Sequence, residues 1–523
     1  MKSKRSILWA TGVILCVGIF FRFWQLGQVP HGMTWDEAAI GYNGYAIITT
    51  RRDEWLERLP LSFRSFGDYK ASLAIYINGV STAIFGMTLW GVRLPFAVSG
   101  VFAIVGFGFF VYQLLPKEKY RLEWAVMGST LLALNPWHIH FSRIGFESGM
   151  SLFFAVWGWV GLLYLLQLKR VKLMVFLMLT GAIAVFLAAS MYAYHSPKLV
   201  VPLITLVLLA YQVAVAKQKR TVLLRSLAVF FAAAVMLFPL VKDVLFGDGG
   251  ARMGELLFFQ QGATTSVWVN IWQNTLLQLS PSFLLDGATT TLRHGGKFWG
   301  YLYPTTFIFS LLGITAVFHK KISRFSLLGI ALVFIGILPA ILGNDVPHSN
   351  RALFALLGYL LLAISGARLL FQIFRHSIGR TTLIGISILL HLFFVLNFFQ
   401  QYFVTFAQAS VIDFQDGYLE AFSIAREYEK GENGKKQVDK ILFSSVYGQP
   451  YIYALFVRKT NPIWYRGGSL NVYEFTDEIS IGDLSRENTL IVATPGQDMP
   501  VQEATHIVMG SDGSVRFEIY VTQ

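Results

Sequence analysis

The chain has 523 residues, of which 54% are hydrophobic, 15% aromatic and only 14% charged. Its mean hydropathy of +0.54 excludes an ordinary soluble globular protein and indicates a membrane protein with many spans. The formal net charge of +13 does not indicate nucleic-acid binding, because the Lys and Arg residues fall in short clusters between apolar runs. A single cysteine, Cys16, excludes an internal disulfide framework.

About eleven apolar runs are long enough to cross a hydrocarbon core of about 30 Å. The first follows Lys2, Lys4 and Arg5 and lacks a small-residue cleavage site, so we expect it to be a retained anchor. The predicted spans are 6–24, 91–115, 122–139, 149–168, 172–191, 198–216, 222–241, 303–319, 325–343, 352–371 and 381–403.

Short basic clusters alternate with these spans. If every run crosses the membrane, the N-terminus and all the clusters fall on one side, which the positive-inside rule identifies as cytoplasmic. The sequence therefore predicts a multi-pass protein of the cytoplasmic membrane whose C-terminal segment is extracytoplasmic. The clusters are Lys117, Lys119 and Arg121; Lys169, Arg170 and Lys172; Lys217, Lys219 and Arg220; Lys320, Lys321 and Arg324; and Arg375 and Arg380.

The segments on the other side are long or rich in His, Asp, Trp and Tyr, whereas the cytoplasmic connections are short. We therefore expect the functional residues in the outward segments or just inside the outer leaflet. These segments are 25–90, 140–148, 192–197, 242–302, 344–351 and the tail from about residue 404.

The composition of the tail differs from that of the rest of the chain. We predict a transmembrane domain over 1–403 and a small extracytoplasmic α/β domain over 404–523. Within the tail the patterns predict strands at 438–446, 488–493 and 515–521, a helix at 417–430 and a hairpin turn at 510–514.

An acidic pair lies in the first outward loop, about a dozen residues after the first span. A carboxylate partly shielded from water by a neighbouring ring such as Trp35 can act as a general base toward a hydroxyl group, and Asp36 and Glu37 are candidates for this role. The structural alternative is that Asp36 only caps a helix that begins near Glu37.

The same loop continues with Asp68 and Lys70, directly before a short apolar stretch over 73–85 that we expect along the outer interface. Lys70 could meet a lipid phosphate there. An interfacial lysine that simply extends to water explains Lys70 equally well.

Further charged residues cluster in the later outward segments. Arg143 and Glu147 are four residues apart, so on one helix they would share a face and could form an ion pair or bind phosphate and hydroxyl groups. Three other motifs combine His with Lys or Arg, a composition suited to a phosphate or diphosphate leaving group, although each alone is more often an interfacial anchor. They contain His195 and Lys198; Arg293 and His294; and Asp345, His348 and Arg351.

The sequence contains no Walker loop, no dinucleotide glycine fingerprint and no zinc-peptidase helix motif. The donor of a transfer reaction would therefore have to arrive already activated. On the outer side of a membrane, this points to a polyprenyl-phosphate carrier.

Together these residues resemble the GT-C membrane glycosyltransferases, with the likeness closest to the branch of the protein O-mannosyltransferases and the lipid A aminoarabinose transferases. The resemblance covers roughly the first 400 residues. It rests on Asp36-Glu37 after the first span, Asp68-Tyr69-Lys70, Phe85-Gly86 before Val92-Arg93-Leu94-Pro95, Pro136-Trp137, and His348 with Arg351. Where the family usually has Lys-Pro-Pro, this chain has Lys70-Ala71-Ser72.

The resemblance implies an all-α polytopic fold with interfacial helices in the first outward loop, and an inverting transfer of a sugar from a polyprenyl phosphate. Asp36 would act on the acceptor, with Glu37 as its neighbour. The first candidates for binding the leaving phosphate are Arg143, Lys198 and Arg351, followed by Lys70, His195, Arg293 and His348.

We expect no cofactor if the donor is a monophosphate, because basic side chains can neutralise it. For a diphosphate donor, a divalent ion held by Asp36, Glu37 and Asp68 is the alternative. The expected partners are membrane lipids, the lipid-linked sugar and a protein, lipid or polysaccharide acceptor, and no nucleic acid.

Two other classes of protein share parts of this pattern. A transporter or lipid-linked sugar flippase is also polytopic, but such proteins typically show internal repeats and ionisable residues at the bilayer midplane. A non-catalytic assembly protein would bind a partner through its tail. The paired acids and bases in several outward segments favour an enzyme over both.

Overall fold

The computed structural model describes residues 2–250, 266–374, 377–465 and 470–523. The chain forms two compact units, each built from separate stretches of sequence. The first contains Met1–Trp24, Tyr69–Ala74 and Phe96–Gln401, and the second contains Gln25–Asp68, Ile75–Pro95 and Tyr402–Gln523.

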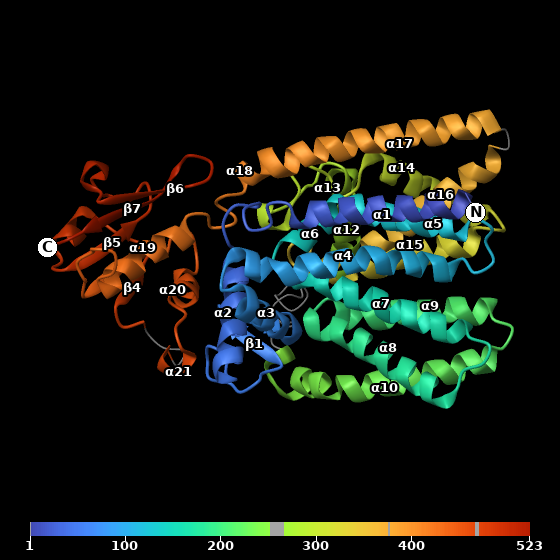
Figure 1. Cartoon of the computed structure of the whole chain (residues 1–523), viewed down its shortest axis with the longest axis horizontal. Coiled ribbons are helices and arrows are strands. Elements are labelled where there is room, and N and C mark those ends of the chain that lie inside the picture. The colour runs from blue at the N-terminus through green and yellow to red at the C-terminus, as the bar shows by residue number, and fades with distance from the viewer. Residues whose placement is uncertain (1, 251–265, 375–376, 466–469) are drawn as a thin grey trace. The chain divides into compact units, whose positions relative to one another are not determined.

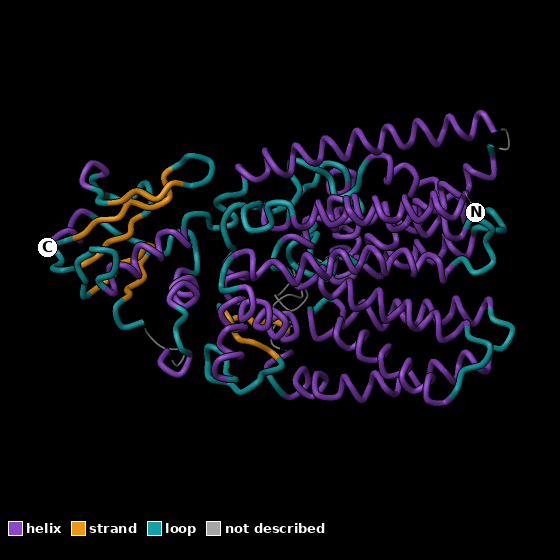
Figure 2. Tube along the Cα trace, viewed as in Figure 1, coloured by secondary structure: helices purple, strands orange, loops and turns teal. Residues whose placement is uncertain are grey.

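The first unit is a bundle of long helices (Figures 1 and 2). Neighbouring pairs such as α7 with α8, α15 with α16 and α14 with α16 pack against each other. The helices are α1 (Lys2–Phe23), α4 (Leu89–Leu114, from Phe96 onward), α5 (Arg121–Leu134), α6 (Pro136–Arg143), α7 (Glu147–Gln167), α8 (Leu173–Ala193), α9 (Pro197–Val215), α10 (Lys219–Phe246), α12 (Val267–Gln278), α13 (Pro281–Leu284), α14 (Pro304–Thr315), α15 (Ser323–Ile341), α16 (Ala355–Ile373) and α17 (Ser377–Gln400).

Each predicted span overlaps a helix of this bundle, and the run 122–139 overlaps two. Among the described residues, eight helices are long and apolar enough to cross a membrane: α4, α7, α8, α9, α10, α15, α16 and the segment that contains α17. The runs 6–24, 122–139 and 303–319 give helices that do not meet this criterion. The fold is therefore the expected polytopic helical one.

The third run departs from its prediction of 122–139. Helix α5 ends at Leu134, and α6 starts separately at Pro136. The side chain of Asn135 caps α6 by accepting a hydrogen bond from the backbone N–H of His138 at 3.0 Å. Pro136 then occupies the first turn, where its missing N–H costs nothing. The break follows from local capping, which the hydropathy of the run does not reveal.

The basic clusters gather at one end of the first unit. Figure 1 shows the connections α4–α5, α7–α8 and α9–α10 at the same end of the bundle as the N-terminal end of α1. These connections carry Lys117, Lys169 and Lys217 with their basic neighbours. The predicted alternation of the spans agrees with this arrangement, and the cytoplasmic identity of this end stays a prediction.

The first outward loop forms its own elements. Helix α2 (Trp35–Thr50) is followed by strands β1 (Ser62–Ser65) and β2 (Asp68–Ala71), which pair in a two-stranded sheet. The short apolar stretch becomes helix α3 (Ser72–Phe85). Its predicted position along the membrane interface stays a prediction.

The tail contains a five-stranded sheet in the order β4-β3-β5-β7-β6. Strand β3 pairs parallel to β4 and β5, whereas β7 pairs antiparallel to β5 and β6. The predicted tail helix and strands are confirmed as α19, β3, β5 and β7. The elements are α18 (Ala407–Ala409), α19 (Tyr418–Lys430), β3 (Lys440–Ser444), α20 (Pro450–Arg458), α21 (Pro462–Tyr465), β4 (Tyr473–Thr476), β5 (Thr489–Ala493), β6 (His506–Met509) and β7 (Val515–Val521).

One core joins the tail to the first outward loop within the second unit. On one face of the sheet, Phe422 of α19 stacks on Phe443 of β3 with ring centroids 4.0 Å apart. The same buried cluster contains Ala38 and Tyr42 of α2. The hydroxyl of Tyr453 in α20 donates to the carbonyl of Met33 at 2.6 Å. The predicted boundary between residues 403 and 404 stays a prediction.

A buried carboxyl group also belongs to this second unit. The carboxyl oxygens of Glu54 accept hydrogen bonds from Trp55 Nε1 at 2.9 Å and from Asn43 Nδ2 at 3.3 Å. Tyr451 of α20 donates a longer one at 3.5 Å. Burial of Glu54 outweighs these donors and raises the pKa of its carboxyl group to about 7.

This shift predicts a pH-dependent second unit. The folded-state pKa of Glu54 lies above that of an unfolded chain, so the folded state binds the proton more tightly and is favoured at low pH. The free energy of unfolding should fall by up to about 3 kcal/mol as pH rises from about 4.5 to about 7. Hydrogen exchange of residues 43–65 in the full-length protein, corrected for intrinsic rates, measures this change.

Glu54→Gln should remove the part of this pH dependence that comes from Glu54, because an amide does not titrate. Burial also raises the pKa of the Asp53 carboxyl group, to about 6, so this residue accounts for the rest of the pH dependence. Glu420→Gln, at an exposed position on α19, is the matched control and should keep it. An E54Q protein with the wild-type pH dependence would contradict the assignment.

Candidate functional site

A buried ion pair fixes the acidic end of the first outward loop. Arg93 Nε lies 2.7 Å from Glu37 Oε1, and both side chains are 0% exposed. A second nitrogen, Arg93 Nη2, donates to Glu37 Oε2 at 3.2 Å, so the pair is bidentate. Arg93 also donates to the carbonyls of Pro30 at 2.8 Å and Gly32 at 2.9 Å. The loop before α2 is therefore attached to the start of α4.

Glu37 has a second structural task at the start of α2. The helix is capped by Thr34, whose hydroxyl accepts from the Glu37 N–H at 3.2 Å while Glu37 Oε2 accepts from the Thr34 N–H at 3.0 Å. The expectation that Asp36 caps this helix is therefore wrong, because Thr34 fills that position. Asp36 lies in the first helical turn and is half-buried.

These contacts give Glu37 a structural role that Asp36 does not share. The carboxylate of Glu37 is committed to Arg93 and Thr34, so a cation held by Asp36, Glu37 and Asp68 would have to displace Arg93. The side chain of Asp68 lies outside the described part of the structure. The catalytic role assigned to Asp36 and Glu37 stays a prediction, and Asp36 does not take part in the ion pair between Glu37 and Arg93.

The first unit contains a cationic pocket, a cavity of about 420 Å³ whose polar lining includes His195, Lys198 and Arg351. Its apolar wall comes from the ends of α8, α9, α10 and α15. That wall is made of Met191, Leu199, Leu237, Leu240, Val241, Val244, Leu245, Pro339 and Leu342. An apolar wall with a few cations suits an anionic amphiphile, since the chain and the charge of such a ligand each meet a matching surface.

Hydrogen bonds order one side of the cationic pocket. His195 Nε2 donates to the backbone carbonyl of Tyr69 at 3.0 Å, and Lys198 Nζ donates to His195 Nδ1 at 3.2 Å. These bonds fix the ring orientation and attach the segment 69–74 to the start of α9. Lys70, next to Tyr69, is 5% exposed.

Arg143 and Glu147 do not share a helical face, so that prediction is wrong. Arg143 ends α6 and Glu147 begins α7, because Ile144 and Phe146 have extended backbones that separate the two helices. Arg143 is fully buried and donates to the carbonyls of Phe21 and Trp24, both at 2.8 Å. These bonds hold the C-terminal end of α1, and neither Arg143 nor Glu147 lines the cationic pocket.

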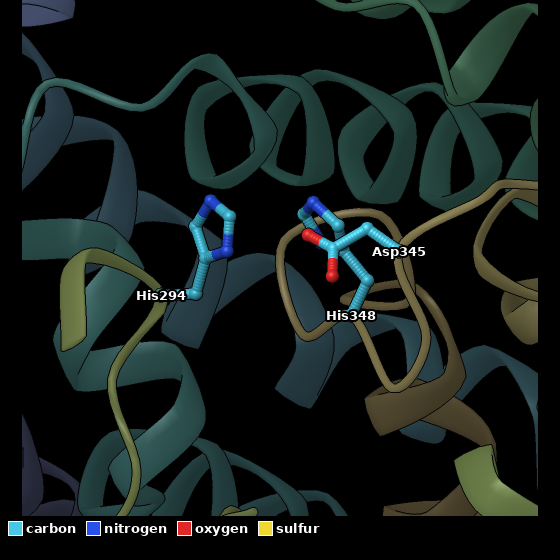
Figure 3. A group of neighbouring side chains, drawn as sticks. All are labelled: His294, Asp345 and His348. Atoms are coloured by element: carbon cyan, nitrogen blue, oxygen red, sulfur yellow. The ribbon is translucent and has the colours of Figure 1, made fainter. Parts of the chain in front are cut away.

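A third group lies where two outward segments meet. The short 3-10 helix η3 (Leu292–His294) and the turn between α15 and α16 bring together His294, Asp345 and His348. Figure 3 shows His294 on one segment and the other two side chains on the other. The candidate ligand atoms of the three residues all lie within 4.8 Å of one another. The neighbouring residue Arg293 is not part of this group, and its backbone carbonyl accepts a hydrogen bond from His140 Nε2 at 3.0 Å.

Two arginine residues make contacts that the sequence patterns do not predict. The sequence indicates Arg93 only as part of a motif, and it does not indicate a role for Arg22. Arg22 is fully buried and its guanidinium lies 2.6 Å from His138 Nδ1 and 2.9 Å from the carbonyl of Ala133. A charged residue inside an otherwise apolar run was the available signal for Arg22.

No family model matches the chain, and no curated protein matches its sequence. Solved structures do resemble it. The archaeal oligosaccharyltransferase AglB from Archaeoglobus fulgidus, in complex with an inhibitory peptide and a dolichol-phosphate, gives a TM-score of 0.54 at 12% identity over 94% of this chain and 70% of AglB. ArnT from Cupriavidus metallidurans bound to undecaprenyl phosphate gives a TM-score of 0.53 at 11% identity over 98% of this chain and 97% of ArnT.

Identities this low carry the fold alone. The chain has the GT-C fold, a mostly helical membrane architecture, here with a small C-terminal sheet domain. The expected resemblance to GT-C proteins is confirmed at the level of fold, and the expected branch within them stays a prediction.

The ion pair predicts different outcomes for the two neighbouring acids. Glu37→Gln leaves Arg93 buried without its counter-charge, so the free energy of unfolding should fall by about 3 to 5 kcal/mol. Asp36→Asn should cost less stability than Glu37→Gln, because it leaves the ion pair between Glu37 and Arg93 intact. Thermal unfolding of the detergent-solubilised variants provides the comparison. Equal stability of E37Q and D36N would refute the structural role of Glu37.

Proposed function

We propose that the chain is an inverting glycosyltransferase that moves a sugar from a polyprenyl-phosphate donor to an acceptor hydroxyl at the outer face of the cytoplasmic membrane. The cationic pocket is the observation that carries this proposal. Lys198 and Arg351 supply positive charge beside an apolar wall, which is what a phosphate attached to a long isoprenoid chain requires.

Two of the similar structures support the choice of donor. ArnT is bound to undecaprenyl phosphate and AglB to a dolichol-phosphate. Both ligands are phosphates of long-chain lipids. We infer that this chain uses a donor of the same chemical class.

The proposed reaction needs one base and one cationic region. Asp36 takes the proton of the acceptor hydroxyl, and the resulting oxygen attacks the anomeric carbon of the sugar. The bond between that carbon and the phosphate oxygen breaks, and the electron pair leaves with the lipid phosphate. Lys198 and Arg351 stabilise the negative charge that develops there, with His195 in the same pocket. Lys70 remains a further candidate for this role. A single displacement inverts the anomeric centre.

We further propose that the transferred sugar is a hexose or a pentose. Within the GT-C proteins, we propose that the chain belongs to the branch of the protein O-mannosyltransferases and the aminoarabinose transferases. The acceptor is a protein, lipid or polysaccharide hydroxyl of the cell envelope. A structure of the Archaeoglobus enzyme tethered to an acceptor peptide supports a protein acceptor as one of these choices.

Removing the pocket cations should weaken donor binding. Lys198→Gln and Arg351→Gln each remove a charged hydrogen-bond donor, so the Kd for undecaprenyl phosphate should rise about tenfold or more. Binding is measured by native mass spectrometry of the solubilised protein. Lys172→Gln, in a basic cluster at the α7–α8 connection, is the matched control. Unchanged binding in both pocket variants would remove the basis of the proposal.

Asp36→Asn should abolish sugar transfer, with a loss of about 10²- to 10⁴-fold in kcat, because the amide cannot accept the proton. Donor binding should stay as in the wild type. A purified assay with radiolabelled lipid-linked sugar measures both. Full activity of D36N would show that another group acts as the base.

Mass spectrometry of the cell envelope with and without the chain identifies the sugar and its acceptor. A missing glycosidic modification is the expected result. Reconstituted vesicles that move the lipid or solute without forming a glycosidic bond would instead favour a transporter.

A further inference from the structure

We propose that His294, Asp345 and His348 form a binding site for a divalent transition metal, for which Zn²⁺ is the best match, and that the bound ion holds the turn carrying Arg351. The binding site itself does not depend on the proposed function. The consequence for Arg351 does, because it assumes that Arg351 binds the donor phosphate.

The site joins segments that are far apart in the sequence. His294 ends the 3-10 helix η3, and the other two ligands come from the turn that links α15 to α16. The rings of His294 and His348 lie 4.3 Å apart between centroids and are inclined by 34°. Figure 3 shows the Asp345 carboxylate next to the His348 ring, with the His294 ring on the other segment. Two donor groups from one turn therefore meet a third that is distant in the sequence.

The distances allow coordination after a small adjustment. The candidate ligand atoms lie within 4.8 Å of one another. Ligands bonded to a tetrahedral Zn²⁺ at 2.0 to 2.2 Å lie about 3.4 Å apart. The side chains would therefore need to close by roughly an ångström, which rotamer changes supply.

The donor set determines the class of ion. Two imidazole nitrogens and one carboxylate oxygen favour zinc and related transition metals over Mg²⁺ or Ca²⁺, which prefer oxygen ligands. Three protein ligands leave a fourth position for water. His348 is 5% exposed, whereas His294 and Asp345 are half-buried, so an ion can still reach the site.

Neighbouring hydrogen bonds hold both segments in place. The carbonyl of His294 accepts from Tyr301 Oη at 3.0 Å and from Ser349 Oγ at 2.7 Å. The backbone N–H of His348 donates to Gln278 Oε1 at 2.9 Å. These bonds fix the backbone from which the ligand side chains of His294 and His348 extend.

The site is linked directly to the cationic pocket. His348 Nδ1 accepts a 3.3 Å hydrogen bond from the backbone N–H of Arg351, and Arg351 lines that pocket. Coordination through His348 Nε2 would place the ring proton on Nδ1, so the Arg351 N–H would lose this acceptor. The ion itself would tie Asp345 and His348 to His294, so metal binding should reposition the turn that carries Arg351 and restrain it through these ligands.

Metal content provides the first test. The full chain, purified without a histidine tag and dialysed against buffer with trace Zn²⁺, should retain about one equivalent of zinc by inductively coupled plasma mass spectrometry. His294→Gln and His348→Gln should each lower the zinc affinity at least about tenfold. His348→Cys should restore binding, since a thiolate is also a zinc ligand. His319→Gln is the matched control and should bind zinc as the wild type does.

Melting temperatures measured without zinc distinguish a variant that has lost a metal ligand from one that is simply less stable. If H348Q melts as the wild type does without zinc but no longer gains stability when zinc is added, the site is confirmed. Wild-type protein that binds no zinc, or H294Q and H348Q variants that keep it, would overturn the proposal.

Hydrogen exchange tests the consequence for Arg351. Zinc should slow exchange over 343–351 and lower the Kd of undecaprenyl phosphate in the wild type but not in H348Q. Zinc binding without any effect on lipid affinity would confirm the metal site and refute its coupling to the donor. A chain that binds zinc but transfers no sugar would leave the metal site standing and refute the proposed function.

Discussion

The ion pair between Glu37 and Arg93 is the constraint on which the first outward loop depends. Taking two charges out of water is costly, and this pair persists because its remaining hydrogen-bonding groups are satisfied by Thr34 and by loop carbonyls. The contacts of Glu37 with Arg93 and Thr34 fix the first turn of α2, and Asp36 lies in that turn. The position of the proposed base therefore depends on the contacts of its neighbour.

The cationic pocket combines an apolar surface with positive charge. A lipid phosphate needs an apolar surface for its chain and charge for its head, and neither is supplied by a helix face alone. The ends of α8, α9, α10 and α15 supply the first; the start of α9 and the segments that follow α8 and α15 supply the second. Placing the cations at helix ends avoids the cost of burying them inside the hydrocarbon region.

The sequence predicted the features that depend on local composition. Hydropathy located the long helices of the bundle but not α6, α12 or α13 as separate elements, and the local patterns of the tail located β3, β5 and β7. His195, Lys198 and Arg351 were selected because cations at span ends suit phosphate, and they do line one pocket. The failures involve tertiary contacts or local breaks. Glu37 meets a partner 56 residues away, and spacing alone placed Arg143 and Glu147 on a helix that the backbone interrupts.

The core shared by α2 and the tail has a consequence for biogenesis. The chain is synthesised from its N-terminus, so residues 25–68 are made before nearly the whole helical bundle, and residues 402–523 are made after it. Until then Ala38 and Tyr42 lack the aromatic residues that cover them. Non-local closure of this kind is slow and leaves apolar surface exposed, so folding of this shared core should depend on chaperones.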